Sequence, residues 1–353
     1  MHVPDGFINA PVSAVTGVVA AGAIAVSLKG ARRELDEKTA PLAGLVAAFI
    51  FAVQMLNFPV AAGTSGHLLG GALAAILVGP YTGVLCVSVV LLMQGILFAD
   101  GGLTALGVNI TDMAIVTTVV AYAVFRGLVK VLPRGRRSIT AAAFVSALLS
   151  VPAAAVAFTL LYALGGTTDV SIDKVATAMV GVHILIGIGE AVITALTVGA
   201  VIAVRPDLVY GARGLTQQLK LRVNGELVDA PEAAPVPDAA PAPVAARTSH
   251  RKVWITGLVA SLVLAGFVSF YASANPDGLE KVATDKGIDK NVEEHAAADS
   301  PLADYGVKDI SNARLSGGLA GVIGVGVTVV AGTGVFWAVR KRRTTEVSPS
   351  QVA

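Results

Sequence analysis

The chain has 353 residues, of which 54% are hydrophobic and only 14% charged, and its mean hydropathy is +0.73. Charged residues make up about a quarter of an ordinary soluble domain, so these values exclude a soluble globular protein. The single cysteine, Cys86, lies in an apolar run and excludes both an internal disulfide and a metal cage built from cysteines. The net charge of +2 by itself excludes no class of protein or partner.

Nine apolar segments follow one another along the chain, and most approach the length of about 20 residues with which a helix crosses a bilayer. The third is short and rich in glycine, which predicts a broken or re-entrant helix that only surrounding protein can bury. The predicted segments are 9–28, 41–60, 67–79, 81–99, 108–125, 139–164, 180–204, 253–273 and 315–339.

These segments predict an all-α integral membrane protein made of two units. Residues 1–204 would form a seven-helix bundle, and residues 253–353 a two-helix unit with an outer loop at 274–313. Between them, residues 205–252 contain the stretch "LVDAPEAAPVPDAAPAPVAART", whose proline and alanine content is typical of an extended cytoplasmic linker. The layout resembles two subunits joined in one chain.

Lysine and arginine are concentrated in alternate loops, which predicts the orientation of the chain in the membrane. With the N-terminus outside and the C-terminus in the cytoplasm, 20 of the 26 basic residues lie in cytoplasmic loops. The opposite orientation would leave only six inside. Because the basic residues lie next to the membrane, they predict contact with lipid and no binding of nucleic acid.

The chain opens with "MHVPDGF", which has a histidine at the second position but lacks the basic residues that begin a secretory signal. The terminal amine of Met1, the amide nitrogen of His2 and the Nδ1 atom of His2 can close two chelate rings on one ion. A fourth nitrogen would complete the square-planar set that is typical of Ni(II) and Cu(II), and that Co(II) can take with further ligands.

His67 is the predicted fourth donor, because it lies in "AAGTSGHLLGG" on the same outer face as Met1. The small residues before it let backbone and ion approach closely. The alternative is a polar cap at the membrane interface that bonds a carbonyl group, and the residues alone leave both interpretations open. His250 and His295 occupy a cytoplasmic flank and an outer loop, where solvated side chains are expected.

Other polar residues could support the ligands or line an ion path. His183 and Glu190 lie seven residues apart in "GVHILIGIGEA", so they share one helix face about 10 Å apart along the axis. Such groups are costly in a membrane, so they either shape an ion path or bond neighbouring helices. Asp100 and Asn109, in "ADGGLTALGVN", could orient the imidazole of His67, as ligating histidines usually require, or receive the N-terminal segment.

The segments "MHVPDGF", "NFPVAAGTSGHLLGGALAAILVGP", "ADGGLTALGVN" and "GVHILIGIGEAVIT" closely resemble the CbiM/NikM family. Its members are the substrate-capturing membrane subunits, or S components, of cobalt and nickel energy-coupling-factor (ECF) transporters. The resemblance covers about residues 1–204. The shorter motif "NPDGLE", at 275–280, resembles the PDGLE-type (CbiN/NikN-like) partner subunit, which has two helices and an outer loop.

The resemblance implies a transported Ni²⁺ or Co²⁺ ion held by Met1, His2 and His67, with no permanently bound cofactor. Pro4, Asp5 and Gly6 would form the turn that points the terminus inward, and Asp5 is a further candidate for supporting the ligands. It also implies a prokaryotic cell membrane, an ECF transmembrane coupling subunit and a pair of cytoplasmic ATPases. The chain itself has no G-x-x-x-x-G-K-[ST] motif, so it is not expected to be an enzyme.

Two other functions remain open from the residues. A channel or secondary carrier that works alone would need a relay of ionisable residues through the membrane, and His183 and Glu190 are few residues for such a relay. An intramembrane hydrolase would need a positioned catalytic set, and no recognised pairing brings serine and histidine together. Nickel and cobalt are not distinguished either, although cobalamin biosynthesis in the host would favour cobalt.

Overall fold

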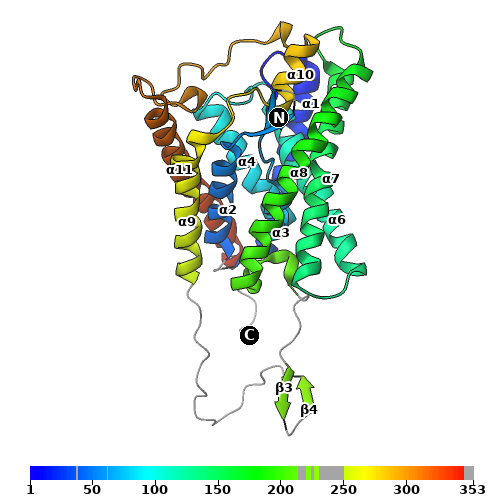
Figure 1. Ribbon diagram of the computed structural model, residues 1–353, viewed down its shortest axis with the longest axis vertical. Helices are drawn as coiled ribbons and strands as arrows, with labels where there is room; N and C mark the ends of the chain where they lie inside the picture. The colour runs from blue at the N-terminus through cyan, green and yellow to red at the C-terminus, as the bar shows by residue number, and fades with distance from the viewer. Residues whose placement is uncertain (37–38, 62, 214–219, 224–225, 230–249, 346–353) are drawn as a thin grey trace, which may run out of the picture.

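The computed structural model describes residues 1–36, 39–61, 63–213, 220–223, 226–229 and 250–345. Within these ranges, seven helices are long and apolar enough to cross a membrane, as a multi-pass membrane protein requires. The amino terminus lies at one end of the bundle, whereas helix α9 begins and helix α11 ends at the other (Figure 1). We call the first of these the outer end, in keeping with the predicted orientation.

Each of the nine predicted segments contains a helix, which confirms the all-α membrane class, but the second helix ends at Gln54 and residues 58–60 of that segment belong to a strand. The fifth is one continuous helix of three parts, because a π-helical turn at Ile110–Val116 joins α5 to α6. The helices are α1 Ala10–Glu34, α2 Thr39–Gln54, α3 Gly71–Val78, α4 Pro80–Leu97, α5 Leu106–Asn109, α6 Thr117–Val131, α7 Arg136–Gly165, α8 Ile172–Val204, α9 His250–Gly266 and α11 Ala313–Thr345.

Helix α3 is the short third segment, and it does not span the membrane. Its eight residues are all buried. At 1.5 Å per residue it is about 12 Å long, less than half of the roughly 30 Å of a hydrocarbon core. The surrounding helices therefore satisfy the condition under which broken helices are tolerated at membrane depth.

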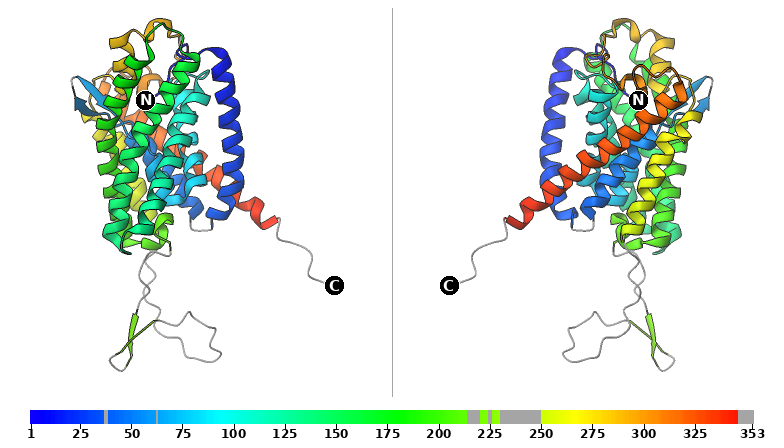
Figure 2. Two further views of the ribbon diagram at one scale, coloured as in Figure 1. Left: turned by 90° about the vertical axis from the view of Figure 1, so that its right-hand side faces the viewer. Right: turned by 90° about the vertical axis from the view of Figure 1, so that its left-hand side faces the viewer.

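The two-helix unit packs directly on the bundle. Helix α11 crosses it obliquely, as both views in Figure 2 show, and it lies along α2. Gly44 of α2 makes this possible, because a Cβ atom there would lie only 2.8 Å from the backbone nitrogen of Thr333. Helix α9 contacts both α2 and α11, so α2 is covered by the C-terminal unit.

The outer end carries short elements that the apolar pattern does not predict. Strands β1 (Phe58–Ala61) and β2 (Thr64–Gly66) form an antiparallel hairpin between α2 and α3. Helix α10 (Gly278–Lys286) lies in the loop between α9 and α11 and packs on α8. Short 3₁₀ turns complete this loop at Val268–Tyr271, Asp289–Asn291 and Ala303–Tyr305.

Elsewhere the described residues add two 3₁₀ turns after α8, at Pro206–Leu208 and Tyr210–Ala212, and a second hairpin. Its strands are β3 (Lys220–Val223) and β4 (Glu226–Asp229). Residues 214–219, 224–225 and 230–249 of the predicted linker lie outside the described residues, and 250–252 begin helix α9.

Candidate metal centre

The amino terminus is folded into the outer end of the bundle, where Met1 is only 3% exposed. Asn109 holds the segment from two sides: its Oδ1 accepts from the backbone nitrogen of Val3 at 2.7 Å, and its Nδ2 donates to the Val3 carbonyl at 3.0 Å. The backbone nitrogen of Gly102 donates to the same carbonyl at 2.9 Å. These bonds pair residue 3 with the chain around it much as a strand pairs with its neighbour.

A tight turn at Asp5 and Gly6 brings the terminus inward. Oδ1 of Asp5 accepts from the backbone nitrogen of Thr104 at 2.8 Å and from its hydroxyl at 2.5 Å. Gly6 has φ of +86°, in the region that favours glycine, and a Cβ atom there would lie 2.0 Å from the carbonyl oxygen of Asn291. Only glycine therefore fits this turn.

His67 follows the β1–β2 hairpin directly and is 5% exposed. Its Nδ1 lies 3.0 Å from the carbonyl oxygen of Leu68, so this nitrogen carries the ring proton and Nε2 is left as a lone-pair donor. Nε2 lies 2.7 Å from the terminal nitrogen of Met1. The following loop is fixed by Glu190 of α8, whose carboxylate accepts from the backbone nitrogens of Leu69 and Gly70 at 2.5 and 2.9 Å.

The imidazole of His2 stacks on that of His67, with 5.1 Å between the ring centroids. Its Nε2 lies 3.1 Å from Oε1 of Gln94, and its Nδ1 lies 3.3 Å from Oδ1 of Asp100. Burial lowers the pKa of His2 to about 4, because desolvation outweighs the attraction of Asp100. The ring is therefore neutral near pH 7, the form in which an imidazole binds a metal ion.

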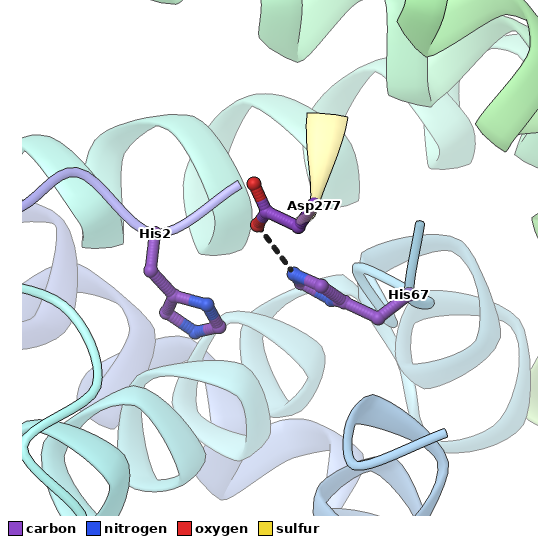
Figure 3. A group of neighbouring side chains, drawn as sticks. All are labelled: His2, His67 and Asp277. Atoms are coloured by element: carbon purple, nitrogen blue, oxygen red, sulfur yellow. Dashed lines mark ion pairs between the residues drawn. The ribbon is translucent and has the colours of Figure 1, made fainter. Parts of the chain in front are cut away.

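Asp277, at the start of α10, is a member of this cluster that sequence reasoning missed. Its Oδ2 lies 2.6 Å from the nitrogen of Met1 and 3.5 Å from Nε2 of His67. Burial opposes ionisation of Asp277, but the terminal ammonium outweighs it and holds the pKa of its carboxyl well below the usual range. One ligand atom each from His2, His67 and Asp277 lie within 4.8 Å of one another, and Figure 3 shows the three side chains converging.

The same end of the molecule contains a cavity of about 440 Å³, lined by His2, His67 and Asp277 among other residues. Tyr305 forms part of its wall and donates its hydroxyl to Oδ2 of Asp100 at 2.5 Å. Tyr305 has φ of +55°, and Ala99, beside Asp100, has φ of +54°. Non-glycine residues in this region are strained and cluster at functional sites, so the loops around His2 fit a binding site.

Comparisons with known proteins place this site in a family. Residues 2–208 match CbiM, described as the cobalt uptake substrate-specific transmembrane region, and residues 251–341 match the PDGLE domain. The chain belongs to the CbiM family. It is thus a component of cobalt or nickel transport. Its CbiM-type region is fused to a PDGLE-type region in one chain.

Individual relatives agree with this assignment. A protein of Haloquadratum walsbyi named for metal transport is 39% identical over 210 residues, which cover 60% of this chain and 94% of that protein. A protein of Archaeoglobus fulgidus named as a fused nickel transport protein, NikMN, is 39% identical over 209 residues, covering 59% and 68%. The solved structure of a truncated transition metal transporter superposes with a TM-score of 0.51 at 29% identity, covering 57% of this chain and 99% of that one.

Within this CbiM-type region, the structure places most of the predicted site residues together at the outer end and the other two, His183 and Glu190, on α8. Met1, His2 and His67 meet at the outer end, and Asn109, Asp5 and Asp100 hold the surrounding backbone and the His2 ring. Glu190 reaches this group only through the loop after His67. His183 is buried on α8, donates from Nδ1 to the carbonyl of Met179 at 2.7 Å, and is not among the converging donors.

Proposed function

We propose that this chain is the substrate-specific component of an ECF-type ABC importer for nickel or cobalt ions. The ion is bound at the outer end by the terminal amine and the His2 amide and imidazole nitrogens, together with Nε2 of His67. The observation that carries the proposal is the buried amino terminus, 2.7 Å from Nε2 of His67 and beside the His2 ring. Four nitrogens in a plane suit Ni(II) and also accept Co(II).

The chemistry of the donors supports this assignment. Ligands at about 2.0–2.1 Å from an ion and at right angles to each other lie about 2.9 Å apart, close to the 2.7 Å that separates the amine from His67. Binding displaces one proton from the terminal ammonium and another from the His2 amide nitrogen, and Nδ1 of His2 exchanges its contact with Asp100 for the ion. Asp277 and Asp100 supply negative charge beside the incoming cation.

Energy for uptake comes from partners in this proposal. A separate transmembrane coupling subunit and cytoplasmic ATPases act on the end of the bundle opposite to the site, in a prokaryotic cell membrane with the N-terminus outside. Glu190 does not take part in a proton relay in this proposal, because its carboxylate accepts hydrogen bonds from the backbone nitrogens of Leu69 and Gly70. This argues against a carrier that works alone.

Isothermal titration of the purified full chain with Ni(II) and Co(II) tests the proposal. One ion per chain is expected, and a two-residue Gly-Ser extension ahead of Met1 should abolish binding, because it moves the amine away from His2 and His67. The same two residues added after Ala353 serve as the matched control. Unchanged affinity in the N-terminally extended chain would show that the amine is not a ligand.

A second experiment separates an importer component from a carrier. Vesicles that contain only this chain should bind the ion without accumulating it, whereas vesicles that also contain the coupling subunit and ATPases should accumulate it with ATP. Accumulation by the chain alone, driven by an ion gradient, would contradict the proposal.

A further inference from the structure

Oδ2 of Asp277 lies close enough to two donor nitrogens to share an ion with them. The amine of Met1, Nε2 of His67 and Oδ2 of Asp277 form a triangle with sides of 2.7, 2.6 and 3.5 Å. A point about 1.1 Å off the plane of this triangle is about 2.1 Å from all three atoms, an ordinary distance for nitrogen and oxygen ligands. The three atoms therefore form one face of a coordination polyhedron.

The position of Oδ2 within that polyhedron follows from the four nitrogens. In the square plane, the corners next to the amine belong to the His2 amide nitrogen and to His67. An atom adjacent to both the amine and His67 cannot occupy a corner of the plane, so Oδ2 lies on the axis. Its partner oxygen, Oδ1, accepts from the backbone nitrogen of Glu280 at 2.8 Å and caps α10, which leaves Oδ2 directed at the donors.

The backbone before Asp277 is fixed to the same hairpin that presents His67. Ser65 of β2 donates its backbone nitrogen to the carbonyl of Pro276 at 2.8 Å and its hydroxyl to the carbonyl of Asn275 at 2.7 Å. The backbone nitrogen of Ser273 donates to the carbonyl of Asn57 at 2.7 Å. The relative position of His67 and Asp277 is thus set by hydrogen bonds to main-chain carbonyls, as a ligand pair requires.

An axial oxygen affects the two candidate ions differently. Ni(II) in a plane of four nitrogens has a filled orbital along the axis, so it gains little from a fifth ligand. Co(II) has one electron fewer and gains more from an axial donor. We propose that Asp277 is an axial ligand that raises the preference of the site for Co(II) over Ni(II), an inference that rests on the proposed function.

Titration of the full chain and of Asp277→Asn with each ion, against a competing chelator, tests this inference. Asparagine caps a helix as well as aspartate does, so the variant keeps α10 and loses the charged oxygen. We expect its affinity for Co(II) to fall by about tenfold and its affinity for Ni(II) to change by less than about threefold. Glu280→Gln, which removes a carboxylate three residues away that, among the described residues, bonds only the Asp277 backbone, is the matched control and should leave the ratio unchanged.

X-ray absorption of the Co(II)-loaded full chain provides a second measurement, and five ligands including one additional oxygen are expected. An equal loss of affinity for both ions would show that Asp277 only positions the amino terminus, and no loss for either would show that it has no role; both results overturn the inference. A four-coordinate cobalt site would overturn it as well. In each of these cases the proposed function stands as long as His67→Ala abolishes binding. If the unmodified chain bound neither ion, both the proposed function and the inference about Asp277 would be wrong.

Discussion

Two buried histidines at different places in the molecule show what makes an imidazole available to an ion. His67 follows the β1–β2 hairpin, and His183 lies within α8. Each donates from Nδ1 to a nearby backbone carbonyl, at 3.0 and 2.7 Å, and so leaves Nε2 as a lone-pair donor. The tautomer and the burial are therefore alike.

The surroundings of Nε2 are what differ. Nε2 of His67 faces the amine of Met1, the His2 ring and Asp277, whereas Nε2 of His183 has no hydrogen-bond partner among the described residues. A single imidazole holds a divalent ion weakly, and affinity comes from several donors that meet at one point. Convergence of other donors, and not the histidine itself, separates the proposed ligand from the structural residue.

The largest expected effect is at His67. His67→Ala removes a proposed ligand, so the affinity for Ni(II) should fall by more than the roughly 100-fold that loss of an outer partner costs. Titration calorimetry measures it. His295→Ala, at the same outer end, removes a histidine whose Nε2 bonds the Gly101 carbonyl and no other group in the described part of the chain, and the variant should keep its affinity within about threefold. If both variants lost a similar amount of Ni(II) affinity, His67 would not be distinguished as a ligand from other histidines at the outer end.

The helices of the fold could be predicted from sequence because a hydrocarbon core demands long apolar runs. The hairpin at 58–66 could not, since strands of four and three residues carry too little alternation to detect. The π-helical turn at Ile110–Val116 lies within the predicted segment 108–125, whose apolar pattern does not distinguish it from an α-helix.

The candidate site could be predicted only in part. The chelating pattern of Met1 and His2 and the shared outer face of His67 suggested those residues. Asp277 was missed because it lies 210 positions after His67, in the motif "NPDGLE", which indicated a PDGLE-type unit and not a ligand. Its role depends on the docking of residues 273–277 onto the hairpin through hydrogen bonds to main-chain carbonyls, an arrangement that the apolar pattern does not record. The available signals were this motif and its place in the predicted outer loop.

The next largest effect concerns the turn that brings the amine to His67. Gly6→Ala forces a side chain into a left-handed backbone and against the Asn291 carbonyl, so the terminus should move and the Ni(II) affinity should fall by about 10- to 100-fold. Gly63→Ala is the control, because Gly63 has φ of +74° with nothing within 4 Å of its Cβ position. If titration gave equal affinities for the two variants, the turn would not position the donors.

A smaller effect is expected at Glu190, which fixes the loop after His67. Glu190→Gln turns an amide group toward one of two backbone nitrogens, so the loop should loosen and the Ni(II) affinity should fall by about tenfold. Glu34→Gln changes a buried carboxylate that caps α4 through the nitrogens of Tyr81 and Thr82, far from the site. Both variants should unfold at lower temperature, but only the first should bind less tightly; a loss of affinity in both would point to general destabilisation.

The smallest effect is expected at His183, and it completes the comparison with His67. His183→Leu loses one hydrogen bond to Met179, which costs about 1 kcal/mol, but it also removes an unpartnered buried Nε2, which costs about 1–3 kcal/mol to keep. The two terms oppose each other, so the unfolding temperature should not fall, and the Ni(II) affinity should stay within about threefold. A large loss of affinity, with the unfolding temperature unchanged, would mean that Nε2 of His183 contacts the ion during binding and that two histidines with the same tautomer share one task.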